Sequence, residues 1–162
     1  MDKYLYLYPQ YIIGVSMLSR GYVAGFIDGE GTIGLYKHKD KRIESGYSIS
    51  AVVKISNTDK DILIKFQKQF GGAIKKVQST TPNGQKEVYS LAFYNFKKIQ
   101  KILQYIKNDL ILKRKQAKLM LEFCQSRLKR SMQNYSKREL ILLNSFPELN
   151  KRGKGGVSEG AD

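Results

Sequence analysis

The stretch that decides the fold is GYVAGFIDGEG, residues 21–31. Its glycines Gly21, Gly25 and Gly29 are four residues apart, so on a helix they lie along one stripe. Each glycine inside a helix costs up to about 1 kcal/mol relative to alanine, and such a stripe allows another helix backbone to come close. The stripe therefore predicts a close helix crossing, either inside the chain or between two copies about a two-fold axis.

Glu30 comes just past the end of the helix predicted from Ser16 to Asp28. A helix C-terminus carries partial negative charge, so a carboxylate there is unfavourable. Two copies crossing at a two-fold axis would bring two such carboxylates together, which requires a cation between them. Carboxylate and carbonyl oxygens suit Mg²⁺. The alternative is that Glu30 is a solvated turn residue. Asp28, within the helix end, is predicted to cap or hydrogen-bond rather than to catalyse.

Strand and helix patterns follow one another along the rest of the chain. Four segments have strand character, with period-two alternation clearest in the second, and they span residues 32–39, 47–56, 73–78 and 87–94. Helical spacing and capping signals predict further helices, which start after Thr58-x-x-Asp61, at Asn95, at about Leu112 and at Ser136. Strand pairs separated by helices predict an α+β fold with an antiparallel sheet.

The length of the chain fits a single domain, which we expect over residues 16–146. Residues 1–15 are predicted to be an N-terminal extension. Pro147 is expected to end the last helix, so that residues 147–162 form a flexible tail rich in basic residues and glycine. The sequence holds one copy of the glycine motif and no internal repeat.

The charge of the chain limits the kinds of partner it can have. Lys and Arg number 29 against 14 Asp and Glu, a net charge of +15, and this self-repulsion indicates nucleic acid or an anionic membrane surface as partner. A membrane partner is disfavoured because no segment is apolar enough to span a bilayer and no long basic amphipathic helix occurs. The lone His38 and lone Cys124 exclude a zinc cluster and a Cys–His nucleophile pair.

Basic and polar residues accompany the predicted strands. A sheet that buries one face can offer the other to a duplex, as strands do when they contact a groove. The candidate DNA-binding residues are Tyr36, Lys37, His38, Lys39, Lys41, Arg42, Lys54, Lys75, Lys76, Gln78 and Lys86.

The motif at residues 21–31 resembles the LAGLIDADG motif of the homing endonucleases. The order of elements to about Gln125 resembles the αββαββα core of that family, and Asn57-Thr58-Asp59 and Phe70-Gly71-Gly72 also fit its pattern. The resemblance implies a curved antiparallel sheet that forms a DNA-binding saddle, with C-terminal helices in addition. It further implies a metal-dependent endonuclease that cuts both strands of a long pseudo-palindromic site and leaves short 3′ overhangs.

The resemblance also implies roles for individual residues. Glu30 and the backbone carbonyl of Gly29 would hold Mg²⁺ or Mn²⁺, and Ca²⁺ would occupy the same position without supporting cleavage. Lys113 would act beside the scissile phosphate, unless it belongs to a solvated basic turn. Asn57 and Lys60 would complete the catalytic set. For Asn57 the alternative is a cap at the start of a helix, and for Lys60 it is a solvated charge. An alignment shift of one residue would instead place Asp61 at the position of Lys60.

A single motif cannot complete an active site within one chain. The resemblance therefore implies a homodimer on double-stranded DNA, with Gly21, Ala24 and Gly25 in the dimer interface. It also implies an intron-encoded origin, with the chain's own intron RNA as a further candidate partner. The expected location is the cytoplasm, or the organelle or nucleoid that holds the target DNA. The rival interpretation is a non-cleaving nucleic-acid-binding protein on the same scaffold, either an intron maturase or a DNA-binding regulator.

Overall fold

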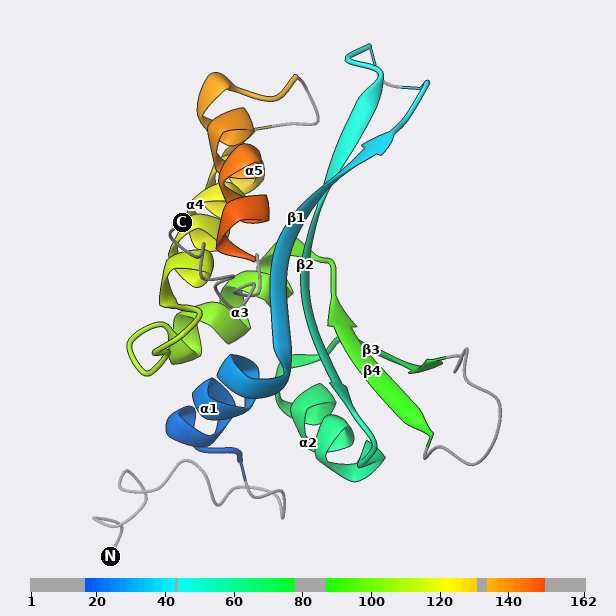
Figure 1. Cartoon of the computed structure of the whole chain (residues 1–162), viewed down its shortest axis with the longest axis vertical. Helices are drawn as coiled ribbons and strands as arrows, with labels where there is room; N and C mark the ends of the chain where they lie inside the picture. The colour runs from blue at the N-terminus through cyan, green and yellow to red at the C-terminus, as the bar shows by residue number, and fades with distance from the viewer. Residues whose placement is uncertain (1–16, 43, 78–86, 131–133, 151–162) are drawn as a thin grey trace, which may run out of the picture.

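The computed structural model describes residues 17–42, 44–77, 87–130 and 134–150. Within these ranges helices and strands alternate as expected (Figure 1). The helices are α1 (Arg20–Glu30), α2 (Lys60–Phe70), α3 (Phe96–Ile106), α4 (Arg114–Lys129) and α5 (Lys137–Leu149). The strands are β1 (Gly31–Lys39), β2 (Tyr47–Asn57), β3 (Ala73–Val77) and β4 (Val88–Phe93). The predicted α+β class with the order αββαββα and further helices is confirmed. No helix in the described ranges is long and apolar enough to cross a membrane.

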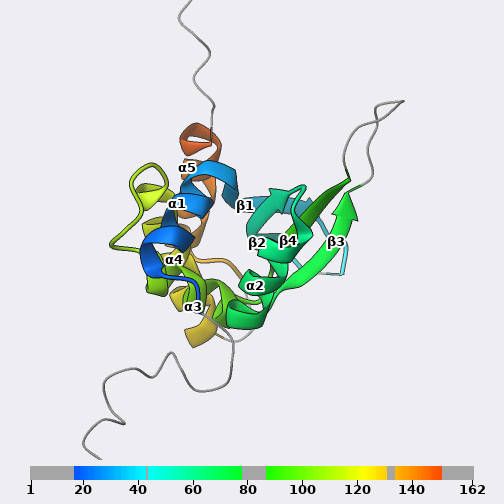
Figure 2. The same cartoon turned by 90° about the horizontal axis from the view of Figure 1, so that it is seen from below.

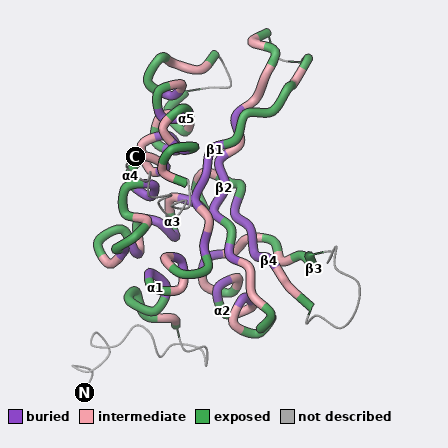
Figure 3. The backbone as a smooth tube through the Cα atoms, viewed as in Figure 1, coloured by how far each residue is buried: buried purple, intermediate pink, exposed green. Residues whose placement is uncertain are grey.

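The strands form one antiparallel sheet in the order β1-β2-β4-β3. Figure 2 shows α1, α3, α4 and α5 gathered on one side, with β3 at the far edge of the sheet. The alternation along β2 is the predicted one: Ile49, Ala51, Val53 and Ile55 are buried against the helices. The opposite face of the sheet is open, and it carries the residues in between, among them Lys54 and Ser56. The β1–β2 hairpin extends beyond the helices, and its end is exposed (Figure 3).

Helix α1 begins later than predicted. The expected start was Ser16, whereas the first helical residue is Arg20, because the Ser19 side chain caps the helix by accepting from the Tyr22 N–H. The chain before this cap is held by Gln69, whose side-chain amide bonds both the N–H and the C=O of Leu18. Two side-chain interactions at adjacent residues therefore fix where α1 starts and at what angle it approaches the sheet.

Helix α5 continues past Pro147, so the prediction that Pro147 ends the helix is wrong. Proline removes a single N–H, and α5 ends with only two more residues, Glu148 and Leu149. The Asn150 N–H then bonds the Phe146 carbonyl, and its side-chain amide donates to the Ile33 carbonyl of β1 at 3.1 Å. The end of α5 is thereby attached to the first strand.

The α4–α5 pair is held by a buried carboxylate. Glu139 is fully buried and forms the predicted capping box with Ser136, while the Ser126 hydroxyl donates to it from α4 at 2.7 Å. Burial alone would raise the pKa of Glu139. Hydrogen bonds from Ser126 and Ser136 and the nearby charge of Arg127 instead hold this pKa below its ordinary value. Glu139 is therefore charged at neutral pH and fixes α5 in place beside β1.

Candidate functional site

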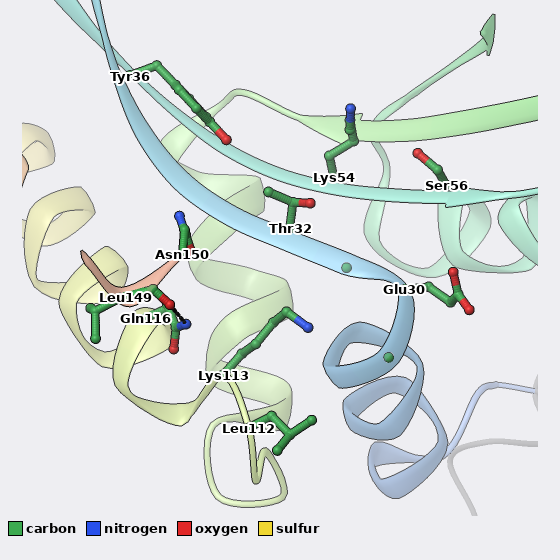
Figure 4. Close-up of a pocket in the computed structure, with 12 residues that line it drawn as sticks. Glu30, Thr32, Tyr36, Lys54, Ser56, Leu112, Lys113, Gln116, Leu149 and Asn150 are labelled. Carbon is green, nitrogen blue, oxygen red and sulfur yellow. Dashed lines mark hydrogen bonds between the residues drawn. The ribbon is translucent and has the colours of Figure 1, made fainter. Parts of the chain in front are cut away.

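An open hollow of about 700 Å³ lies where α1 runs into β1 (Figure 4). It is lined from four parts of the chain: the α1–β1 junction, the open face of the β1–β2 hairpin, the start of α4 and the end of α5. The lining residues are Gly29, Glu30, Gly31, Thr32, Tyr36, Lys54, Ser56, Leu112, Lys113, Gln116, Leu149 and Asn150. The structure thus brings together five residues predicted from the sequence, namely Gly29, Glu30, Tyr36, Lys54 and Lys113.

Glu30 is the last residue of α1 rather than the residue after it, and its side chain is exposed at the rim of the hollow. Gly31 turns the chain directly from α1 into β1. A Cβ on Gly31 would lie 2.6 Å from the Ile27 carbonyl oxygen, so only glycine allows this close approach. The turn therefore fixes residue Glu30 at the negative end of the helix, as the sequence suggested.

Lys113 is docked on the motif helix and is not part of a solvated turn. It is the N-cap residue of α4 and is half-buried, and its ammonium group donates to the backbone carbonyl of Asp28. A cation at this point compensates the partial negative charge of the α1 C-terminus. In Figure 4 its side chain extends from the start of α4 towards α1. The lysine and the acid predicted to act together therefore approach the same helix end, although they are 83 residues apart in sequence.

Asp28 has the hydrogen-bonding role predicted for it. One carboxylate oxygen accepts the N–H groups of Ile111 at 2.7 Å and Leu112 at 3.2 Å, and the other accepts the Lys113 N–H at 2.9 Å. The carboxylate thus binds the segment that leads into α4.

Asn57 and Lys60 do not line the hollow. Asn57 lies opposite Tyr89 on the helix-facing side of the sheet, and its side chain accepts the Asp59 N–H at 2.8 Å. The Lys60 ammonium lies 5.2 Å from the centre of the Tyr89 ring. Strand alternation directs Asn57 away from the open face, so the structure does not bring these two residues together with Glu30 and Lys113, and their catalytic role stays a prediction. Asp59, rather than Thr58, caps α2 by accepting the Asp61 and Ile62 N–H groups.

The candidate DNA-binding residues divide between the two faces of the sheet. Alternation from the buried Ile33 and Leu35 places Tyr36 and His38 on the open face, as it does Lys54 and Lys75. The His38 ring bonds the Ser50 hydroxyl on that face at 2.7 Å. Lys37, Lys39 and Lys76 alternate to the other side, which corrects the prediction that they share one face.

The other basic candidates contact neighbouring side chains or lie in the hairpin turn. The Lys37 ammonium is 3.9 Å from the centre of the Tyr47 ring, and Lys76 forms an ion pair with Glu87. Lys41 and Arg42 lie in the hairpin turn, where the Arg42 guanidinium forms two hydrogen bonds of 2.9 Å with Asp40. Gln78 and Lys86 lie outside the described residues. The open face of the described chain therefore carries Lys54 and Lys75 as its predicted cations.

The glycine stripe has no partner within the described chain. Gly21, Gly25 and Gly29 are exposed, and a Cβ at any of them would meet nothing within 4 Å. A close crossing inside the described part of the chain is thereby excluded. Ala24 is placed differently from the prediction: it is 1% exposed and packs in the core of its own chain, because it lies beside the stripe on the flank of α1 that Val23 and Ile27 bury.

The donors at the end of α1 suit a magnesium ion without enclosing it. Among the described residues no group of three or more His, Cys, Asp or Glu could hold a metal. Mg²⁺ characteristically takes one or two carboxylates and completes its shell with water and substrate phosphates. The Glu30 carboxylate and the Gly29 carbonyl at an open hollow fit that pattern. Burial raises the pKa of the Cys124 thiol to about 12, which removes it as a nucleophile or ligand at neutral pH.

Sequence reasoning missed several residues of the hollow. Thr32 and Ser56 flank Lys54 on the open face, and the alternation already visible in β2 could have indicated Ser56. Gln116 and Asn150 enter from α4 and the end of α5, where the Gln116 side chain donates to the Leu149 carbonyl at 3.0 Å. No local pattern marks these two positions, because they reach the site only through packing of the helices.

Several solved structures share this fold. The archaeal intron-encoded homing endonuclease I-Vdi141I, solved with DNA, matches with a TM-score of 0.70 and 20% identity over 83% of this chain and 85% of that chain. I-CvuI, also solved with DNA, has a TM-score of 0.66 and 21% identity over 85% of each chain. I-SmaMI bound to cleaved DNA has a TM-score of 0.63 and 23% identity, over 88% of this chain and 46% of that one. At these identities the likeness establishes a shared fold.

Sequence comparison then gives the family. The search of curated protein sequences found no match. The sequence model described as LAGLIDADG endonuclease matches residues 23–143, which is most of the chain. The chain therefore belongs to the LAGLIDADG endonuclease family, as a member with a single motif. The family match supports its assignment as a DNA endonuclease.

Proposed function

We propose that the protein is a site-specific homing endonuclease that works as a homodimer. Each copy would hold one half of a long pseudo-palindromic DNA site, and hydrolysis of one phosphodiester bond in each strand would leave short 3′ overhangs. The observation that carries the proposal is the meeting of Glu30, Gly29 and Lys113 at one helix end, in an open hollow beside the open sheet face.

The open face of the sheet is the proposed DNA-binding surface. It carries Lys54 and Lys75 with the polar side chains Tyr36 and His38, and the chain has a net charge of +15. Contacts from lysine to phosphate give affinity, while polar side chains on strands can reach base edges in the major groove. I-Vdi141I and I-CvuI, which share this fold, were solved in complex with DNA.

Glu30 and the Gly29 carbonyl are the proposed metal ligands. Mg²⁺ or Mn²⁺ bound there would supply a more acidic water and charge stabilisation at the leaving oxygen. I-CvuI was solved with Mg²⁺ and with Ca²⁺. The part of Lys113 is to hold a positive charge at the same helix end, where it would stabilise the negative charge that develops on the phosphate.

The proposal is tested with the DNA that flanks the reading frame. Joined without the interrupting segment, these flanks should form the target, and purified protein with Mg²⁺ is expected to linearise a plasmid that carries them. A plasmid with the interrupted site is the control and should stay supercoiled. Binding to the joined site without any cleavage, across Mg²⁺ and Mn²⁺, would favour the rival interpretation of a non-cleaving binding protein.

Replacement of Lys113 by methionine is expected to slow cleavage about 100-fold, because removal of one stabilising group costs on that order. DNA affinity should change little, since most of the phosphate contacts remain. The rate is measured in single-turnover cleavage of the target plasmid. Lys118→Met is the matched control: it removes the same charge from the same helix, at an exposed residue that lines a different hollow. Equal rates for Lys113→Met and the unmodified protein would remove the catalytic assignment.

A further inference from the structure

Asp28 connects the end of α1 to the segment that carries Lys113. Its carboxylate accepts three consecutive backbone N–H groups, from Ile111, Leu112 and Lys113, at 2.7, 3.2 and 2.9 Å. Its backbone carbonyl accepts the Lys113 ammonium group. One residue of the motif helix therefore binds both ends of the lysine, although Asp28 itself does not line the hollow.

The Asp28 contact lies directly at the N-terminus of helix α4. Its N-cap residue is Lys113, which forms no side-chain capping bond. The first N–H groups of a helix have no partner within the helix, and its N-terminus carries partial positive charge. The Asp28 carboxylate accepts the N–H of the N-cap residue Lys113 and of the two residues before it, and it brings a negative charge to this N-terminus from a different helix. The end of α1 and the start of α4 are thus joined by charge-assisted hydrogen bonds.

Few other contacts of the described chain fix the segment before α4. The side chains of Ile111 and Leu112 are 79% and 73% exposed, so packing contributes little there. Leu110 is buried, its N–H bonds the Ile106 carbonyl of α3, and its carbonyl accepts the Arg114 side chain of α4, so these contacts hold Leu110 itself. Loss of the Asp28 carboxylate would therefore free the backbone at Lys113 first.

We propose that Asp28 is a positioning residue for DNA cleavage and that it acts through Lys113. This inference rests on the proposed function of the site. The carboxylate sets the backbone from which the lysine side chain starts, and the Asp28 carbonyl sets where the ammonium group lies before DNA is bound. Misplacement of a catalytic group by about 1 Å costs on the order of 100-fold in rate.

The test is a double-mutant cycle in the full-length protein on its target DNA with Mg²⁺. Asp28→Asn keeps the size of the side chain, but it removes the charge and turns an NH₂ group towards backbone N–H donors. We expect single-turnover cleavage to fall about 10- to 100-fold with DNA affinity unchanged. Asp28→Asn/Lys113→Met is expected to cleave as slowly as Lys113→Met alone, because residues that act as a unit are not additive.

A matched control separates positioning from loss of stability. Asn95 caps α3 by accepting the Lys97 and Lys98 N–H groups, and Asn95→Ala removes that cap away from the site. It should lower the melting temperature about as much as Asp28→Asn and leave cleavage unchanged. Amide hydrogen exchange at residues 111–113 should quicken in Asp28→Asn and stay as it is in Asn95→Ala.

Three outcomes would overturn the inference. Additive losses in the double variant would show that Asp28 acts independently of Lys113, and parallel losses of cleavage in Asp28→Asn and Asn95→Ala would show a structural role only. Unchanged exchange at residues 111–113 would show that the carboxylate does not anchor the segment. If the unmodified protein binds its target and does not cut it, the proposed function fails together with the inference. Any of the three results above overturns the inference alone and leaves the proposed function intact.

Discussion

Replacement of Glu30 by glutamine is expected to abolish DNA cleavage and to leave DNA binding intact. Glutamine keeps the shape of the side chain but provides no charged ligand, so the metal at the end of α1 would be lost. A metal supplies several kcal/mol of charge stabilisation, and about 1.4 kcal/mol is tenfold in rate, so the loss should be about a thousandfold or more. Cleavage is measured on the target plasmid with Mg²⁺, and binding by gel shift with Ca²⁺.

A second readout follows from the position of Glu30 at the negative end of a helix. In a dimer two such carboxylates would repel each other whenever no cation lies between them. The unmodified dimer should therefore dissociate more readily in EDTA, whereas Glu30→Gln should be insensitive to EDTA. Sedimentation with and without Mg²⁺ measures this difference in dimer dissociation between the unmodified protein and Glu30→Gln. A merely solvated turn acid would show no such coupling between metal and assembly.

Glu122→Gln is the matched control for this experiment. It makes the same chemical change on α4, where Glu122 pairs with Arg138 at 2.5 Å on the exposed side of the helices. An exposed ion pair contributes little to stability, so this variant should bind and cleave normally. Cleavage by Glu30→Gln at the rate of Glu122→Gln would remove the metal assignment. Loss of DNA binding by Glu30→Gln alone would indicate a structural role instead.

Local signals in the sequence predicted the elements of this fold. Asn95 caps α3, and Ser136 with Glu139 forms the capping box of α5, each within a few residues of the group it satisfies. The burial of alternate β2 residues follows in the same way from a pattern inside one strand. Where two local signals competed, the outcome was less predictable: Asp59 caps α2 although the neighbouring Thr58 is also a capping residue type.

The candidate site was predictable in part. The motif indicated Glu30 and Gly29, and the resemblance indicated Lys113, but no local pattern shows that Lys113 bonds Asp28 across 85 residues. That contact exists only because α1 and α4 both pack against α3, which brings the end of α1 to the start of α4. The division of the lysines between the two sheet faces was available from strand alternation. It was missed because the face that carries Lys37 and Lys39 is buried near the helices and exposed beyond them.

Substitution of Gly25 is expected to separate the two explanations of the glycine stripe. A Cβ at Gly25 meets nothing within 4 Å in the single chain. If the stripe stays exposed in solution, Gly25→Ala should stabilise α1 by about 1 kcal/mol, which raises the melting temperature by roughly 2–4 °C for a chain of this size. If two copies of α1 pack there, added atoms hold the backbones apart and the dimer weakens.

We expect the second result, most clearly in Gly25→Leu. The leucine side chain should convert the protein to a folded monomer in sedimentation, and double-strand cleavage should fall about 100-fold or more, since a misplaced catalytic group alone costs that order. Asn144→Leu is the control: it adds an exposed leucine on α5, distant from the stripe, and should remain dimeric and active. A dimeric, fully active Gly25→Leu would place the two-fold axis elsewhere.

The reason for so large an effect is that, in the proposed dimer, one chain would supply only half of the metal ligands. Each copy contributes a single Glu30, and the described residues of one copy provide no third acidic or histidine ligand. A folded Gly25→Leu monomer keeps Lys54, Lys75 and the open face, so it should still bind a half-site of DNA with lower affinity. Loss of cutting with residual half-site binding would then locate the defect in assembly. An unfolded variant, in contrast, would lose both and would show no cooperative melting.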